Sequence, residues 1–91
     1  MKFEWDERKN KENIAKHGLS FYVPQKAFYD ERRVILVDKA HSISEHRYFC
    51  IGNIDNNIVT VRFTMRDEAI RIFGAGYWRK GRKIYEERHN I

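Results

Sequence analysis

The sequence has one cysteine, one proline and no long apolar run. A single cysteine excludes an intramolecular disulfide, and the neighbours Phe49 and Ile51 indicate that Cys50 is a small buried hydrophobe. No stretch approaches the roughly 18 apolar residues that a membrane span requires, and the charged N-terminal segment does not resemble a signal peptide. We therefore expect a cytoplasmic protein that makes no use of a membrane.

Metal ligands are also scarce. The four histidines show neither HxxxH nor HExxH spacing, and no second cysteine is available to complete a site. The sequence predicts neither a metal ion nor any other cofactor.

Ninety-one residues are enough for one compact domain but not for two. Hydrophobic residues make up 42% of the chain and aromatic residues 14%, which allows a packed core although charged residues reach 34%. No repeat, low-complexity tract or linker indicates a boundary. We expect a single domain that spans residues 1–91.

Basic residues outnumber acidic ones by 18 to 13, which gives a formal net charge of +5. The excess is concentrated in residues 70–91, where six Lys or Arg face two Asp or Glu. Such a surface attracts a polyanion by steering and counterion release. An ordinary solvated basic helix is the alternative interpretation.

The first third of the chain predicts a strand followed by helices. Residues 2–5 alternate polar and apolar, and helix formers fill residues 7–17 between Asp6, a good N-cap, and Gly18, a good C-cap. This helix is polar, so we expect it to pack through Trp5 and the aliphatic stems of its lysines.

Four strands are expected in the middle of the chain, after a second helix that runs from Ser20 to near Asp30. The first strand, residues 33–38, is apolar on both faces, which is typical of a strand covered on two sides. Residues 47–54 and 58–65 flank Asp55-Asn56-Asn57, a sequence that favours a tight hairpin. In the second of these runs, alternate residues separate a core face from a polar face.

The fourth strand covers residues 69–73 and ends at Gly74-Ala75-Gly76. Residues 77–88 then predict a basic C-terminal helix, in which Gly81 costs about 1 kcal/mol relative to Ala. The expected order is β-α-α-β-β-β-β-α. It describes an α+β domain of two layers, an antiparallel sheet packed with N-terminal helices and a C-terminal helix.

Charged residues cluster on the predicted strands. Glu45 and Arg47 open one strand, Arg62 and Arg66 belong to its hairpin partner, and Arg71 lies on the next strand. Because neighbouring strands bring their side chains together, we expect these groups near one end of the sheet.

Such a cluster has the groups that a metal-free ribonuclease needs. Glu and His suit the proton transfers at the 2′-hydroxyl and the leaving oxygen, and Arg matches the phosphate fork. Surface ion pairs worth under about 1 kcal/mol each are the alternative interpretation.

The C-terminal helix mixes basic and aromatic side chains that could bind unpaired RNA bases. The candidates for RNA binding are Lys16, Arg62, Trp78, Arg79, Lys80, Arg82, Lys83 and Tyr85. The aromatic residues could equally anchor the helix to the sheet. His17 is either a proton carrier or a helix C-terminal residue that interacts with the helix dipole.

Residues spread over nearly the whole chain follow one family pattern. They are Phe3-Glu4-Trp5-Asp6, Lys9, Asn13, Lys16-His17-Gly18, Phe21, Ala27-Phe28, Asp30, Asp38, Glu45, Arg47, Gly52, Thr64, Arg66 and Arg71-Ile72. In order and spacing these residues resemble the BrnT toxins. The resemblance implies a RelE-like fold and a type II toxin that cleaves RNA without a metal and arrests translation and growth.

The resemblance also implies a cognate BrnA-type antitoxin, with a heterotetramer or similar complex. DNA would then be contacted only through the antitoxin, which represses the shared operon. Glu45, Arg47, Arg66 and Arg71 fall on family positions and are the expected catalytic residues, followed by His17. In our hypothesis Glu45 or His17 moves protons and the arginines hold the phosphate.

One departure from the family pattern affects this hypothesis. Many members carry Ser-Ala-Arg where this chain has Gly74-Ala75-Gly76. The missing arginine leaves open a second function, a non-catalytic module on the same fold that binds RNA or a partner protein. A DNA-binding regulator acting alone is a weaker alternative, because no helix-turn-helix pattern appears.

Overall fold

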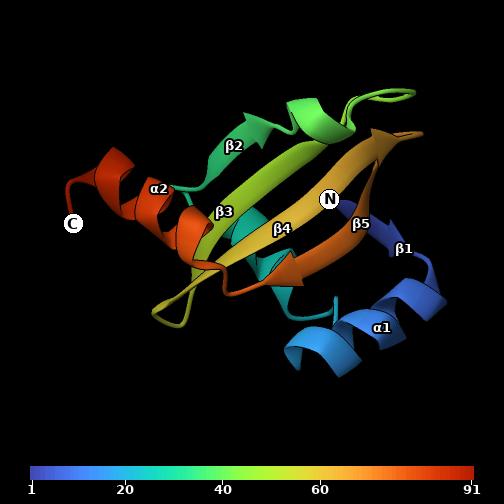
Figure 1. Ribbon diagram of the computed structural model, residues 1–91, viewed down its shortest axis with the longest axis horizontal. Helices are drawn as coiled ribbons and strands as arrows, with labels where there is room; N and C mark the ends of the chain where they lie inside the picture. Colours follow the sequence, from blue (N-terminus) through green and yellow to red (C-terminus); the bar gives the residue numbers. More distant parts are fainter.

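The computed structural model describes residues 1–91 as a five-stranded mixed sheet with helical segments on both faces (Figure 1). The strands are β1 (Lys2–Trp5), β2 (Val34–Val37), β3 (Tyr48–Ile54), β4 (Asn57–Arg66) and β5 (Ala69–Gly76). The helices are α1 (Glu7–His17) and α2 (Arg79–His89), with the 3₁₀-helices η1 (Pro24–Tyr29) and η2 (Lys39–His41). The α+β class is confirmed. No helix is both long and apolar enough to cross a bilayer.

The expected order and strand directions need correction. The second helical segment is the six-residue 3₁₀-helix η1, held by i→i+3 bonds such as Lys26 N to Val23 O at 3.1 Å, and η2 adds a short turn between β2 and β3. The sheet order is β1-β5-β4-β3-β2, and β1 pairs with β5 in parallel. A wholly antiparallel sheet was therefore wrong: the long crossover between β1 and β5 permits the parallel pairing.

Two tight turns connect the three central strands. Asp55 and Asn56 have φ values of 48° and 70°, and β3 and β4 pair on either side of them, which confirms the predicted hairpin. Asp67 and Glu68, with φ values of 51° and 67°, make a second hairpin between β4 and β5. Aspartate and asparagine tolerate this left-handed region better than most residues.

The caps of α1 are as predicted. The carboxylate of Asp6 accepts a hydrogen bond from the Arg8 amide at 2.8 Å, which lowers the pKa of Asp6, and Gly18 ends the helix with φ 64°.

Lys9 of α1 lies over the ring of Phe73 in β5, but α1 also packs through two buried asparagines that the sequence analysis did not predict. Asn13 is buried, and its side chain donates to the carbonyl of Ala75 at 2.9 Å and accepts from the Ala75 amide at 3.2 Å. Asn10, also buried, accepts from the Phe21 amide at 2.8 Å. Because β1 pairs only as far as Ile72, the Asn13 amide continues the hydrogen bonding of the β5 edge.

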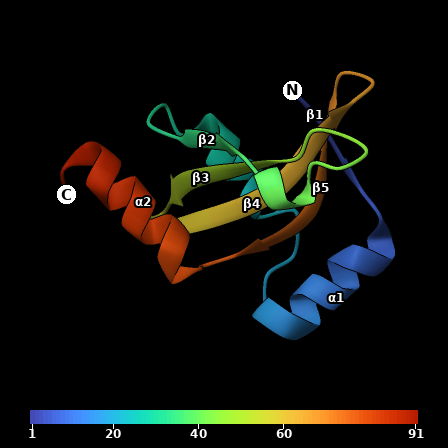
Figure 2. The ribbon, with the colours of Figure 1, turned by 45° about the horizontal axis from the view of Figure 1, so that its top comes forward.

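Helical segments cover the sheet on both faces. Figure 1 shows η1 behind the sheet and α2 across the front of one end, and in Figure 2 α1 and α2 lie at opposite ends. The main core lies under η1, where Gly52 has no side chain and the backbone of Ala27 approaches it directly. Its buried members are Leu19, Phe21, Ala27, Phe28, Cys50, Ile54, Val59, Val61, Phe63, Ile70, Ile72 and Ala75. Cys50 is fully buried as predicted, and burial raises the pKa of its thiol to about 12.

A smaller core fills the α2 side of the sheet, formed by Val34, Ile51, Ile58 and Tyr85. The glycine Gly81 packs directly on Thr60 of β4, where a Cβ atom would overlap the threonine hydroxyl. Because α2 covers only one end, the polar residues at the other end of this face remain open. We call this uncovered part of the sheet the open face.

Three further expectations are corrected. Strand β2 is an edge strand with Ile35 46% and Val37 51% exposed, so it is not covered on two sides. In β4 the two faces do not separate cleanly, since Thr60 is buried beneath α2 and Met65 is 52% exposed. Strand β5 continues through Gly76, because its pairing with β4 resumes after a bulge.

Candidate active site

A folded loop between β2 and β3, residues 38–47, positions most of the site. The Ser42 hydroxyl donates to the carbonyl of Asp38 at 2.7 Å and accepts from the amide of Arg47 at 2.9 Å. The Asp38 amide donates to the Arg47 carbonyl at 2.7 Å, which closes the loop at its base. The Thr64 hydroxyl donates to the His46 carbonyl at 2.6 Å and ties the loop to β4. These hydrogen bonds hold the backbone of the loop in place, and its charged side chains extend from that backbone.

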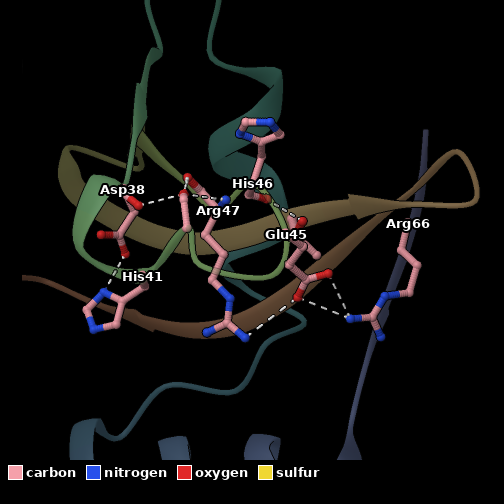
Figure 3. A network of polar contacts seen from close by, with 8 residues as sticks. Asp38, His41, Glu45, His46, Arg47 and Arg66 are labelled. Atoms are coloured by element: carbon pink, nitrogen blue, oxygen red, sulfur yellow. Dashed lines mark hydrogen bonds and ion pairs between the residues drawn. The ribbon is translucent and has the colours of Figure 1, made fainter.

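Glu45 lies between two guanidinium groups. Its carboxylate accepts hydrogen bonds from one nitrogen of Arg66 at 3.1 and 3.2 Å, and Arg47 lies 3.6 Å away on the other side (Figure 3). All three side chains are partly exposed. The guanidinium of Arg47 also lies 4.2 Å from the ring centre of Phe73, a cation–π contact. We call Glu45, Arg47 and Arg66 the carboxylate–arginine cluster.

Arg71 lies on the same face but in a separate ion pair. Arg71 pairs across the β4–β5 ladder with Thr64, which precedes Arg66 by two residues in β4. Its guanidinium lies 3.5 Å from the carboxylate of Glu4 in β1. The sheet thus brings Glu45, Arg47 and Arg66 into contact and places Arg71 beside them.

A small hollow of about 60 Å³ adjoins the cluster. We call it the basic hollow; it is lined by Lys9, Asp38, His41, Arg47, Arg62 and Phe73. Nε of Arg62 is buried without a hydrogen-bond partner in the protein. Sequence analysis placed Lys9 and Asp38 on the family pattern but assigned no role to them or to His41. The Asp-x-x-His spacing at the end of β2 could have drawn attention to Asp38 and His41.

The glycines that replace the family Ser-Ala-Arg each lie under a larger side chain. A Cβ atom at Gly74 would be 2.8 Å from a terminal nitrogen of Arg62, and one at Gly76 would be 2.6 Å from the indole of Trp78. Glycine at these two positions lets Arg62 and Trp78 lie against the backbone of β5.

His17 lies far from the carboxylate–arginine cluster. Its ring packs edge-on against Trp78 at 5.4 Å, next to Gly76, whereas Arg66 pairs with Ala69 at the opposite end of β5. The structure therefore does not bring His17 to Glu45, and Glu45 is the only one of the two proton carriers of the hypothesis that lies among the arginines.

The RNA-binding candidates range from exposed to buried, and Arg62 and Trp78 are partly buried. Five are exposed, namely Lys16, Arg79, Lys80, Arg82 and Lys83, although Arg82 also pairs with Glu86 at 3.1 Å. Tyr85 is 2% exposed and donates its hydroxyl to Asp30. Base stacking by Tyr85 was therefore a wrong prediction, and the alternative of an aromatic anchor holds for this residue.

A cavity of about 440 Å³ lies between α2 and strands β2 and β3. Its lining is mainly apolar, with Trp78 and Lys80 at the α2 side, and contains none of the carboxylate–arginine cluster. No group of three or more His, Cys, Asp and Glu side chains that could hold a metal ion occurs in the structure.

The fold and the cluster define a small basic α+β domain with an arginine-rich site suited to RNA phosphate. A family model described as "Ribonuclease toxin, BrnT, of type II toxin-antitoxin system" matches residues 5–81. The chain therefore belongs to the BrnT toxin family. Membership implies an RNA target and an antitoxin partner. No curated protein matches the chain by sequence.

Proposed function

We propose that this toxin is an endoribonuclease that needs no metal and cleaves RNA at the carboxylate–arginine cluster. The observation that carries the proposal is one carboxylate, Glu45, held between the guanidinium groups of Arg47 and Arg66 on the open face of the sheet. Arginine forks match phosphate oxygens, and a carboxylate beside them can accept the proton of the attacking hydroxyl.

The reaction is an in-line transesterification. Glu45 takes the proton of the ribose 2′-hydroxyl, the 2′-oxygen bonds to phosphorus, and the bond from phosphorus to the 5′-oxygen breaks as that oxygen takes up a proton. Arg47 and Arg66 neutralise the charge that gathers on the phosphate oxygens, and Arg71 holds the neighbouring phosphate. The products are a 2′,3′-cyclic phosphate and a 5′-hydroxyl.

Four exposed basic residues near the start of α2 extend the RNA contact beyond the scissile phosphate, together with Lys16 and Trp78; they are Arg79, Lys80, Arg82 and Lys83. These residues form a cationic surface that tracks a backbone regardless of sequence. His17, which contacts Trp78, belongs to this surface rather than to the chemistry.

In the cell, RNA cleavage would inhibit translation and arrest growth until a BrnA-type antitoxin covers the toxin. This complex, a heterotetramer or similar assembly, would bind operator DNA through the antitoxin alone. The five-stranded mixed sheet with helices on both faces supports a relation to RelE-like toxins, and a cytoplasmic location follows from the RNA target.

The absence of the family arginine favours a second candidate, a non-catalytic module that binds RNA on the same face. The indole of Trp78 lies against Gly76, the residue that stands in place of that arginine. On this reading the cluster retains RNA without breaking it.

Incubating purified protein with end-labelled RNA in EDTA separates the two candidates. Cleavage that disappears in Arg66→Ala but persists in Arg88→Ala, an exposed arginine of α2, supports the nuclease. Retention of intact RNA by the wild type supports the binding module. Cleavage that EDTA abolishes contradicts the metal-free reaction.

A further inference from the structure

His41 is the one histidine that lines the basic hollow next to the cluster. Its Nδ1 lies 2.9 Å from Oδ2 of Asp38, which is buried, while the His41 side chain itself is 56% exposed. A carboxylate at Nδ1 fixes a proton there and leaves Nε2 as the atom that can exchange a proton with a ligand. The pair therefore consists of a proton carrier and the residue that orients it.

The exposed ring of His41 is not required to hold the conformation of the loop. The Ser42 hydroxyl and the backbone hydrogen bond from Asp38 to Arg47 already close the loop, so the loop does not need the imidazole for its shape. His46, in the same loop, makes no polar contact through its ring and points away from the Arg47 guanidinium in Figure 3. Of the two loop histidines, only His41 is oriented by a carboxylate.

The groups around His41 suit a phosphodiester. Lys9 from α1, Arg47 from the loop and Arg62 from β4 line the same hollow, and Asp38 is the only acidic residue among them. Nε of Arg62 is a buried donor that no protein atom satisfies, and such a donor is costly unless a ligand accepts from it. An anion is the ligand class that this lining fits.

We infer that His41 is the general acid of the cleavage reaction and that Asp38 is its positioning residue. The inference rests on the proposed ribonuclease function, in which Glu45 is the base but no residue protonates the leaving group. Protonated His41 donates its Nε2 proton to the 5′-oxygen as the bond between phosphorus and that oxygen breaks. Neutral imidazole remains, with its Nδ1 proton held by Asp38.

The charged groups that line the hollow with His41 are Asp38 and the cations Lys9, Arg47 and Arg62. A phosphate in the hollow would offset these cations. Phe73 is the uncharged side chain in the lining, and its ring contacts the Arg47 guanidinium.

The test compares His41→Gln with the matched control His46→Gln in the EDTA cleavage assay. We expect His41→Gln to cleave about 10²- to 10⁴-fold more slowly, as is typical for loss of a general acid, and His46→Gln to cleave at the wild-type rate. The wild-type rate should fall as the pH rises above neutrality, and this fall should be absent in His41→Gln. Imidazole added to His41→Gly should restore part of the rate.

Asp38→Asn tests the positioning role on the protein without RNA. Ring ¹⁵N chemical shifts should report the Nδ1–H tautomer of neutral His41 in the wild type and a change of tautomer in Asp38→Asn. A wild type that cleaves while His41→Gln keeps its full rate overturns this inference but not the proposed function. A wild type that cleaves no RNA overturns both, and an unchanged tautomer in Asp38→Asn overturns the role of Asp38.

Discussion

The hydroxyl of Tyr85 in α2 donates a 2.6 Å hydrogen bond to Oδ2 of Asp30 at the end of η1. The same carboxylate accepts from the amides of Asn53 and Arg32 at 2.8 and 2.9 Å, so it joins α2 to β3 and to the segment between η1 and β2. Burial alone would raise the pKa of Asp30, but these hydrogen bonds outweigh it and hold the pKa below its usual value. Burial and the adjacent carboxylate raise the pKa of Tyr85 to about 12.

Replacing Tyr85 by Phe should lower the free energy of unfolding by about 1.5–3 kcal/mol at neutral pH, the usual contribution of a hydrogen bond to a charged group. Because the pKa of Asp30 is lower in the folded state, its contribution is present above about pH 4 and is lost as the pH falls through the folded-state value. Urea unfolding at several pH values should therefore show wild type and Tyr85→Phe converging in acid. Tyr77→Phe, at an exposed tyrosine, is the control, and equal stabilities at neutral pH would contradict the prediction.

Glycine at position 81 of α2 should make the protein more stable than alanine would, although alanine has the higher helix propensity. Propensity alone predicts a gain of about 1 kcal/mol for Gly81→Ala, but the added Cβ would overlap the Thr60 hydroxyl. We expect Gly81→Ala to destabilise the protein by about 1–3 kcal/mol through overpacking.

A double-mutant cycle checks this contact. Thr60→Ala removes a hydroxyl that is buried without a partner, and should cost little. In the Thr60→Ala protein, Gly81→Ala should lose most of its cost. Additive effects measured by chemical unfolding would show that the two residues do not limit the approach of α2.

Asn13→Ala should be among the more costly single substitutions in α1. It removes three hydrogen bonds and leaves the amide and carbonyl of Ala75 without partners in a buried region. A loss of about 2–4 kcal/mol is expected, with faster hydrogen exchange of the Ala75 amide. The neighbouring exposed residue supplies a control, Glu12→Ala, which should change stability by less than about 0.5 kcal/mol. A small effect of Asn13→Ala would mean that water replaces the side chain.

Local sequence patterns predicted the helices, strands and turns. The burial and hydrogen bonding of individual side chains depend on residues far away in the sequence. Asp6 and Gly18 predicted the ends of α1, and Asp55-Asn56 predicted the hairpin, because each of these signals acts within a few residues. The role of Asn13 depends on Ala75, 62 residues away, and the exposure of Ile35 depends on the position of β2 at the sheet edge. Neither relationship has a local pattern.

The candidate site was predictable to a similar extent. Hairpin pairing was sufficient to place Arg66 near Glu45, but the loop geometry that orients His41 toward Asp38 depends on the bonds of Ser42. Tyr85 was assigned to RNA because its aromatic ring follows a basic segment. Its contact with Asp30, 55 residues earlier, could not be inferred from that spacing.

Gly74→Ser tests whether the family departure at this position matters for RNA. The new Cβ would lie 2.8 Å from a terminal nitrogen of Arg62 and 3.1 Å from Nε, so the guanidinium must leave its place above β5. Because the end of a flexible side chain moves, we expect a stability change below about 1 kcal/mol. RNA binding should weaken, and the slope of log affinity against log salt should fall by about one phosphate contact.

Arg62→Ala supplies the comparison for this prediction. If Gly74→Ser acts by displacing Arg62, both variants should show the same reduced salt slope, and combining them should add no further loss. Filter binding of a short RNA at several salt concentrations measures both quantities. A Gly74→Ser protein that binds as the wild type does, while Arg62→Ala binds more weakly, would show that Arg62 reaches RNA from a position that Gly74 does not control.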